Sequence, residues 1–395
     1  MRRVGGLVVA VLVAASLVVG AGAARAAAPT PARLVTITIP AKHANIPAKW
    51  LQYPGPPRAN VLLPPGYDPS RKYPLLVLLH GLNCNYAWAA QSGLTKALDG
   101  LDAIVVMPEG GSGWYADWWN DGLRGDPSWE TYFLDDVMPT VLAKYPIRPE
   151  RQYHAIVGVS MGGLGATYLG GRLPGFFGAV GSLSGFVDPG WFAWLVAPAM
   201  GFTALAPFKG NLDLSPVVGP ANGFYMQGHN PTTLVGNLSN TRVFVATGNG
   251  QPSPRAPFNV PGSPAEGAII YPMNQIYAAT LQASGVDVTY KTQTGGHDNL
   301  DFRFELQAFL RWGPFKPVAT APRSWTNRTV ATRGHLWDVA YSFARPPDRL
   351  VAITRRDDQL TVSAAGSDVT LVTDGGCVVR AHTPSKVKVP TAPCR

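Results

Sequence analysis

The sequence predicts an α/β fold with a mostly parallel central sheet. Short apolar runs rich in β-branched residues alternate with longer segments of helical spacing across most of the chain. This alternation is typical of parallel strands joined by crossover helices. The chain has 395 residues, of which 46% are hydrophobic and 14% charged. That length exceeds one typical domain, so we expect one large domain and one small one.

The first 28 residues have the organisation of a secretory signal peptide. Met1-Arg2-Arg3 precedes an uncharged apolar run that ends at Val19, and Ala24-Arg25-Ala26 follows as a small-x-small cleavage site. The apolar run is shorter than the roughly 20 residues that a membrane-spanning helix needs. We therefore expect cleavage near Ala26 or Ala28, and a mature protein that is secreted or lies in the cell envelope.

Residues 29–314 contain the alternating pattern and are predicted to form the catalytic domain. Gly, Pro or polar residues bound each apolar run, as expected for buried strands. The expected strands are Leu75–Leu79, Ala103–Met107, Ala155–Val159, Ala179–Leu183, Val243–Thr247 and Val286–Tyr290. The expected helices are Tyr86–Leu98, Ser128–Lys144, Met161–Gly171 and Glu266–Ala283.

Two regions interrupt the alternation. The segment from Asp188 to Asn230 is rich in Gly, Pro and large apolar residues without a clear period, and is expected to be core packing or an apolar lid over the active site. Residues 315–323 form a Pro/Ala-rich linker, and residues 324–395 are expected to form a small all-β module. That module could bind carbohydrate or cell wall, or could be a packing or solubility appendage.

Cysteine and charge content restrict the cellular setting. In an oxidising compartment Cys377 and Cys394 could form a disulfide, which would leave Cys84 free. The formal net charge is +9, but the Lys and Arg residues are not clustered. A nucleic-acid partner is therefore not expected, whereas the positive charge could attract the protein mildly to anionic envelope surfaces.

A nucleophile motif follows the strand Ala155–Val159. Ser160 is the central residue of Gly-Val-Ser-Met-Gly, and a helical segment begins at Met161. The strand, turn and helix in this order are typical of a nucleophile elbow, in which close backbone approach requires glycine at 158 and 162. This succession of strand, serine-bearing turn and helix also predicts the α/β-hydrolase fold. A buried turn of small residues is the alternative interpretation.

A base and an acid are needed to activate the serine. His297 follows the last expected strand in a glycine-rich turn, and the chain order of serine before histidine is that of α/β-hydrolases. Between Thr247 and Gly285 the only carboxylate is Glu266, which makes it the candidate acid by elimination. Glu266 could instead be a first-turn helix residue stabilised by the helix dipole.

The backbone on two loops can supply an oxyanion hole. The N–H of Met161, just after the nucleophile, is one expected donor, and the N–H of Leu82 in His80-Gly81-Leu82 is the other. The side chains of His80, Trp114 and Trp118 are candidates for substrate contact, although part of the aromatic cluster is expected in the core.

The motifs together resemble the secreted mycolyltransferase and esterase D family over roughly Leu34 to Trp312. The resemblance rests on several short motifs, which are Leu79-His80-Gly81-Leu82, Val106-Met107-Pro108, Trp114-Tyr115-Ala116-Asp117-Trp118, Trp129-Glu130-Thr131-Tyr132, Gly158 to Gly163 and Gly248-Asn249-Gly250. It implies a serine esterase or acyltransferase with a Ser-acid-His triad and neither metal nor cofactor.

The chain departs from trehalose-specific mycolyltransferases at several positions. His80 and Asn83 stand where those enzymes carry an acidic and a basic residue, and Asp298-Asn299 follow the histidine where Ser-Trp is usual. The family's acid normally comes soon after Gly-Asn-Gly, whereas here Gln251 to Arg255 contains no carboxylate. These departures favour general ester hydrolysis, or transfer of another acyl group, over mycolate transfer to trehalose.

The sequence therefore predicts a secreted enzyme that forms an acyl-enzyme from an acyl ester or lipid, with water or a hydroxyl compound as acceptor. A catalytically weak or inactive extracellular binding protein on a hydrolase scaffold is the alternative. The missing carboxylate near Gly250 favours that alternative, and the intact serine and histidine motifs oppose it.

Overall fold

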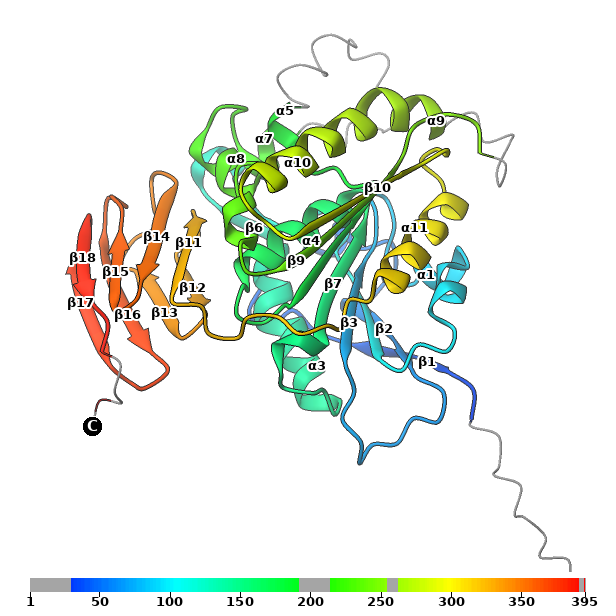
Figure 1. The fold of residues 1–395 in the computed structure, drawn as a ribbon, viewed down its shortest axis with the longest axis horizontal. Coiled ribbons are helices and arrows are strands. Elements are labelled where there is room, and N and C mark those ends of the chain that lie inside the picture. Colours follow the sequence, from blue (N-terminus) through cyan, green and yellow to red (C-terminus); the bar gives the residue numbers. More distant parts are fainter. Residues whose placement is uncertain (1–29, 192–213, 254–261, 391–393, 395) are drawn as a thin grey trace, which may run out of the picture.

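The computed structural model describes residues 30–191, 214–253, 262–390 and 394 (Figure 1). The expected signal peptide lies outside the described residues, as does the middle of the segment from Asp188 to Asn230. At the described ends of that segment, short helices α5 (Pro189–Trp191), α7 (Ser215–Val218) and α8 (Phe224–His229) are present.

An eight-stranded sheet forms the centre of the molecule, with the strand order β1-β2-β4-β3-β7-β8-β9-β10. Strand β2 pairs antiparallel with β1 and β4, and all pairs from β4 to β10 are parallel. The expected mostly parallel sheet is confirmed. Its strands are β1 (Arg33–Thr38), β2 (Arg58–Leu63), β3 (Leu75–Leu79), β4 (Ile104–Pro108), β7 (His154–Val159), β8 (Ala179–Leu183), β9 (Arg242–Gly248) and β10 (Val288–Gln293).

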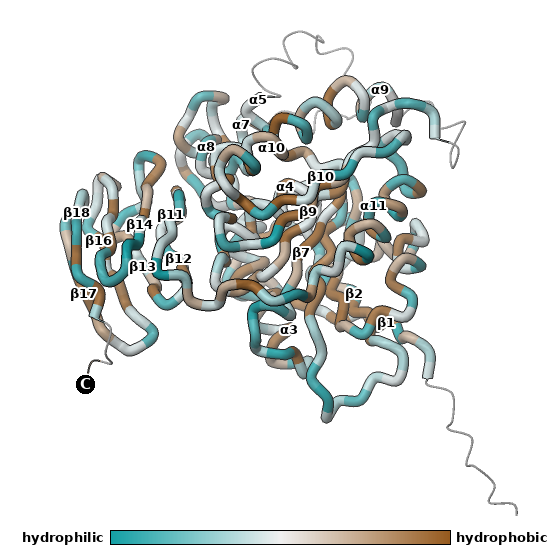
Figure 2. Tube along the Cα trace, viewed as in Figure 1, coloured by the Kyte–Doolittle hydropathy of each residue, from teal (hydrophilic) through white to brown (hydrophobic). Residues whose placement is uncertain are grey.

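Helices cover both faces of this sheet, and the strands send alternate side chains to each face. In β3, Leu75, Val77 and Leu79 enter one apolar core, whereas Leu76 and Leu78 enter the other. This is why the central strands are continuous apolar runs, drawn brown in Figure 2. Helices α3 (Met138–Lys144), α4 (Met161–Arg172) and α10 (Tyr271–Ala283) contribute to the first core; α1 (Trp88–Gln91) and α11 (Asn299–Trp312) contribute to the second.

Three expected helices are interrupted, for identifiable reasons. The segment 86–98 is divided into α1 and the 3₁₀ turn η2 (Leu94–Leu98) because Gly93 adopts a φ of 74°. The segments 128–144 and 266–283 contain π-helical turns, η4 (Tyr132–Val137) and η9 (Glu266–Ile270), directly before α3 and α10. Each following helix has proline at its second residue, and proline lacks the N–H that would continue regular α-helical bonding.

The C-terminal region contains eight further strands in two four-stranded antiparallel sheets. Their orders are β11-β14-β15-β18 and β12-β13-β16-β17, and side chains from both sheets share one apolar core. The strands are β11 (Ser324–Thr329), β12 (Arg333–Leu336), β13 (Val339–Phe343), β14 (Val351–Arg356), β15 (Gln359–Val362), β16 (Asp368–Thr373), β17 (Val378–His382) and β18 (Ser385–Lys388). The region is therefore a β-sandwich.

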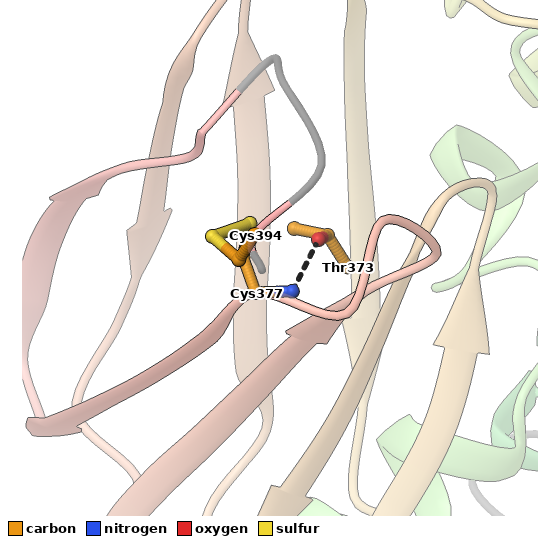
Figure 3. The surroundings of a disulfide bond; sticks show 3 residues. All are labelled: Thr373, Cys377 and Cys394. Atoms are coloured by element: carbon orange, nitrogen blue, oxygen red, sulfur yellow. Dashed lines mark hydrogen bonds between the residues drawn. A yellow bond between two sulfur atoms is a disulfide. The ribbon is translucent and has the colours of Figure 1, made fainter.

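A disulfide joins Cys377 to Cys394 at one end of this sandwich, and Cys84 is free. Figure 3 shows the disulfide together with the hydrogen bond that the Cys377 N–H donates to Thr373 Oγ1, at 3.1 Å. Cys394 is thus attached to the turn between β16 and β17.

The sandwich lies beside the C-terminal end of α4, which is the end far from Ser160. The Asn327 side chain donates to the Gly171 carbonyl at 2.8 Å, and the Arg172 guanidinium donates to the Tyr341 hydroxyl at 3.2 Å. Residues 313–323, which contain neither helix nor strand, are anchored by Arg151, whose guanidinium donates to the Ala319 carbonyl at 2.9 Å. The nucleophile helix is therefore held at its C-terminal end by the β-sandwich.

Candidate active site

Ser160 occupies the turn between β7 and α4. Its backbone has φ 56° and ψ −119°, a conformation that is rare for a residue with a side chain and persists where surrounding structure enforces it. A Cβ atom at Gly158 would lie 1.9 Å from the Gly162 carbonyl oxygen, and one at Gly162 would lie 2.4 Å from that of Leu79. Glycine is therefore required on both sides of the serine, as the sequence predicts.

The ring of His297 lies between Ser160 and a carboxylate. Its Nε2 is 2.9 Å from Ser160 Oγ, and its Nδ1 is 2.6 Å from Glu266 Oε2. The side chain is 22% exposed and its ring packs edge-on against Phe302. With the proton on Nδ1 donated to Glu266, the unprotonated Nε2 accepts the Ser160 hydroxyl proton, which is the arrangement that activates a serine.

Glu266 is fully buried in the π-helical turn η9, and both of its oxygens are engaged. Oε1 accepts hydrogen bonds from the hydroxyls of Ser184 and Thr247, each at 2.7 Å, and Oε2 contacts His297. The geometry brings together Ser160, His297 and Glu266, the three residues proposed from the sequence.

The two proposed oxyanion donors belong to segments that lie next to Ser160. Gly81 lies directly against the serine, since a Cβ atom on it would be 3.4 Å from Ser160 Cβ. Leu82 follows Gly81, and Met161 begins α4. Among the described residues, neither the Leu82 N–H nor the Met161 N–H donates to a protein acceptor, so both remain free for an oxyanion.

His80 is buried rather than open to a substrate, with only 3% exposure. The Gly110 N–H donates to its Nε2 at 3.0 Å, so the ring proton is on Nδ1, which donates to the Gly81 carbonyl at 2.9 Å. Because C=O and N–H point in opposite directions across a peptide bond, this contact orients the Leu82 N–H. The structure thus places His80 beneath the loop that carries Leu82, and not at an open surface.

The two tryptophans differ in their surroundings. Trp114 is only 3% exposed and packs edge-on against Phe186, so it belongs to the core rather than to an open substrate surface. Trp118 is half-buried, packs against Trp50 and donates from its indole nitrogen to the Gly113 carbonyl at 3.2 Å. Of the candidate substrate contacts, only Trp118 keeps exposed surface.

Sequence reasoning missed the residues that support the triad. Ser184 and Thr247 lie at or just after the carboxyl ends of the parallel strands β8 and β9, where polar side chains commonly form sites. Asp301 in α11 is fully buried and accepts from the Gly296 N–H at 2.8 Å, which fixes the loop that carries His297. Polar residues at strand ends were the signal that could have identified the first two.

A separate cavity of about 660 Å³ lies at the junction with the β-sandwich. Its lining includes neither Ser160 nor His297, and contains the buried ion pair between Glu130 and Arg172.

Within the described ranges, no group of three or more His, Cys, Asp or Glu residues is arranged to hold a metal ion. None of the helices in those ranges is long and apolar enough to cross a membrane.

Comparison with known proteins extends these observations. A family model described as "putative esterase" matches residues 52–312. The diacylglycerol acyltransferase/mycolyltransferase Ag85A of Mycobacterium leprae is 29% identical over 244 residues, which cover 57% of this chain and 69% of the relative. Ag85A of Mycobacterium tuberculosis is 31% identical over 247 residues, covering 57% and 68%.

Solved structures agree on the fold. Mycobacterium tuberculosis MPT51 superimposes with a TM-score of 0.54 at 20% identity, covering 70% of this chain and 96% of that protein. The serine hydrolase FphF of Staphylococcus aureus gives 0.54 at 16% identity, covering 73% and 100%. The α/β-hydrolase fold predicted from the sequence is confirmed. The chain belongs to the putative esterase family, and its relatives identify it as an ester hydrolase or acyltransferase.

Proposed function

We propose that the protein is a secreted serine esterase or acyltransferase in which Ser160, His297 and Glu266 form the catalytic triad. The observation that carries the proposal is the unbroken chain of contacts from Ser160 Oγ through the His297 ring to Glu266, at 2.9 and 2.6 Å. It is supported by the strained backbone of Ser160 and by the family match over residues 52–312.

In this mechanism His297 Nε2 removes the proton of Ser160 as Oγ attacks the acyl carbonyl. The tetrahedral oxyanion accepts hydrogen bonds from the N–H groups of Leu82 and Met161, and the positive end of α4 beneath Ser160 stabilises its charge. His297 then gives its proton to the leaving alcohol, and Glu266 stabilises the imidazolium. The product is an ester between the acyl group and Ser160.

The second half-reaction decides between hydrolysis and transfer. Water as acceptor releases a free acid, whereas a sugar or lipid hydroxyl takes the acyl group. Both acceptors use the same triad.

We further propose that residues 1–28 are a signal peptide, that residues 29–314 form the catalytic domain, and that the linker 315–323 joins this domain to a C-terminal module. Export to the envelope is consistent with the disulfide between Cys377 and Cys394.

An inactive binding protein was the alternative on sequence grounds because no carboxylate follows Gly250 closely. That observation no longer favours an inactive protein, because Glu266, 31 positions before His297 in the chain, contacts the His297 ring. We therefore propose that the protein is an enzyme and not an inactive binding protein.

The direct test is hydrolysis of p-nitrophenyl esters, from acetate to palmitate, by the full mature chain. We expect turnover by the wild type and a loss of at least about 10³-fold in Ser160→Ala. The control is Ser182→Ala, because the Ser182 hydroxyl is buried and has no partner among the described residues. Added glycerol or trehalose tests for transfer, which lowers the free acid formed per nitrophenol. Wild-type activity retained in Ser160→Ala would refute the triad.

A further inference from the structure

A second buried carboxyl group lies behind the triad. Glu305 in α11 is 1% exposed, and its Oε1 is 2.8 Å from the hydroxyl oxygen of Ser184. That hydroxyl is also 2.7 Å from Glu266 Oε1. Two carboxyl groups therefore share one serine hydroxyl, in a chain that runs from Glu305 through Ser184, Glu266 and His297 to Ser160.

The hydrogen bonds among these side chains indicate which of the two carboxyl groups is neutral. Ser184 has a single hydroxyl proton, so it can donate to only one of its two carboxyl neighbours. Glu266 has donors on both oxygens, from Ser184 and Thr247 on one side and His297 on the other. Glu305 Oε2 has no hydrogen-bond partner among the described residues. Both contacts of the Ser184 hydroxyl are satisfied if Glu305 carries a proton and donates it to Ser184 Oγ.

The charges around Glu305 favour the same state. Burial raises the pKa of Glu305 well above its usual range, and the nearby carboxylates raise it further, that of Glu266 most strongly. The neighbouring elements supply no compensating cation within the described residues. Strand β8 has no charged residue, Lys96 of η2 is exposed, and Arg242 at the start of β9 pairs with Asp287. On α11 itself Arg303 is only half-buried, and Asp298 and Asp301 raise the pKa of Glu305.

We propose that Glu305 is a positioning residue that stays protonated while the enzyme works and, through Ser184, fixes the orientation of Glu266 toward His297. The inference rests on the proposed triad. The proposal explains why Glu305, a buried carboxyl group without a counter-ion, is separated from Glu266 by the side chain of Ser184 alone. As a neutral donor, Glu305 orients Ser184 so that the hydroxyl proton of Ser184 is donated to Glu266. Glu266 Oε1 is then occupied, and Oε2 faces the imidazole.

Protonation of Glu305 links the free energy of unfolding to pH. The carboxyl group of the unfolded chain has a pKa of about 4.3, and the folded one has a raised pKa. Between these two values the folded protein holds one more proton than the unfolded chain. This contribution to stability is therefore full below the unfolded pKa and is lost as the pH rises toward the folded pKa.

Glu305→Gln separates this linkage from the hydrogen bond. The amide keeps a donor toward Ser184 but cannot titrate, whereas Glu305→Leu removes the donor altogether. Gln307→Leu, on the half-exposed side of the same helix, is the matched control. We would measure urea unfolding of all four proteins from pH 5 to pH 8, and kcat and KM for a p-nitrophenyl ester over the same range.

We expect the ratio of unfolding equilibrium constants, wild type over Glu305→Gln, to rise with pH, by at most about tenfold per pH unit while the pH lies between the unfolded and the folded pKa of Glu305. Glu305→Gln should keep kcat within about threefold, whereas Glu305→Leu should lose about tenfold or more in kcat with little change in KM. A ratio that does not change with pH, or equal kcat losses in both variants, would overturn the proposal. A wild type that cleaves no ester refutes the proposed function instead, and the stability ratio still decides whether Glu305 is protonated.

Discussion

Replacing Glu266 by glutamine removes the charge that stabilises the imidazolium and leaves the shape of the side chain nearly unchanged. Glu266 is fully buried and its Oε2 is 2.6 Å from His297 Nδ1. Opposite unit charges whose centres are about 4 Å apart attract by about 4 kcal/mol at the effective dielectric constant of about 20 that suits protein sites. Because about 1.4 kcal/mol corresponds to tenfold in rate, kcat should fall about 10³-fold.

The orientation of the new amide could enlarge this effect. If its NH₂ group faces His297, the ring must place its proton on Nε2, which then cannot accept from Ser160. The corresponding replacement of the triad aspartate by asparagine in a serine protease costs about 10⁴-fold. The assay is steady-state hydrolysis of a p-nitrophenyl ester at pH 7 to 8, with KM expected to change little. Asp298→Asn is the control, since Asp298 caps α11 through the N–H groups of Leu300 and Asp301, and asparagine caps equally well. A kcat for Glu266→Gln within tenfold of wild type would refute the assignment of the acid.

Three further predictions concern the loops and the β-sandwich. His80→Phe removes the donor to the Gly81 carbonyl, so kcat should fall about tenfold to a hundredfold with unchanged KM, and a loss below twofold would contradict its role in orienting Leu82. Burial raises the pKa of Cys84 to about 11, so at pH 8 iodoacetamide should modify it on the order of a hundred times more slowly than a free cysteine; an equal rate, followed by mass spectrometry, would contradict this burial. Cys377→Ser opens a loop of 17 residues and should lower the free energy of unfolding by about 3 kcal/mol while kcat stays unchanged, as urea titration and ester hydrolysis would show; equal stability would mean that the disulfide does not constrain the unfolded chain.

The central strands and the nucleophile turn could be predicted from the sequence because their signals are local. Strands β3, β7 and β8 are buried on both faces, so they are continuous apolar runs, and the spacing of glycines around Ser160 follows from backbone clashes within a few residues. Glu266 could be identified by elimination, because no other carboxylate lies between Thr247 and Gly285.

Other features depend on tertiary packing, which no local pattern reveals. Strands β1 and β2 were not predicted, because they contain polar residues such as Thr36 and Asn60, whose side chains hydrogen-bond to each other across the pair. Helix α11 was not predicted, because its inner face carries two buried acids, Asp301 and Glu305, among apolar residues. The burial of Trp114 results from the contact with Phe186, which lies 72 positions away in the sequence.

The central claim is that the fold activates the Ser160 hydroxyl as a nucleophile. The most direct measurement is labelling of the full mature chain with a fluorophosphonate, followed by peptide mass spectrometry to locate the adduct. The proposed triad predicts one adduct per chain, on Ser160, with none in Ser160→Ala and a much slower reaction in Glu266→Gln. No adduct, while an active control esterase is labelled, or an adduct on another serine, would contradict it.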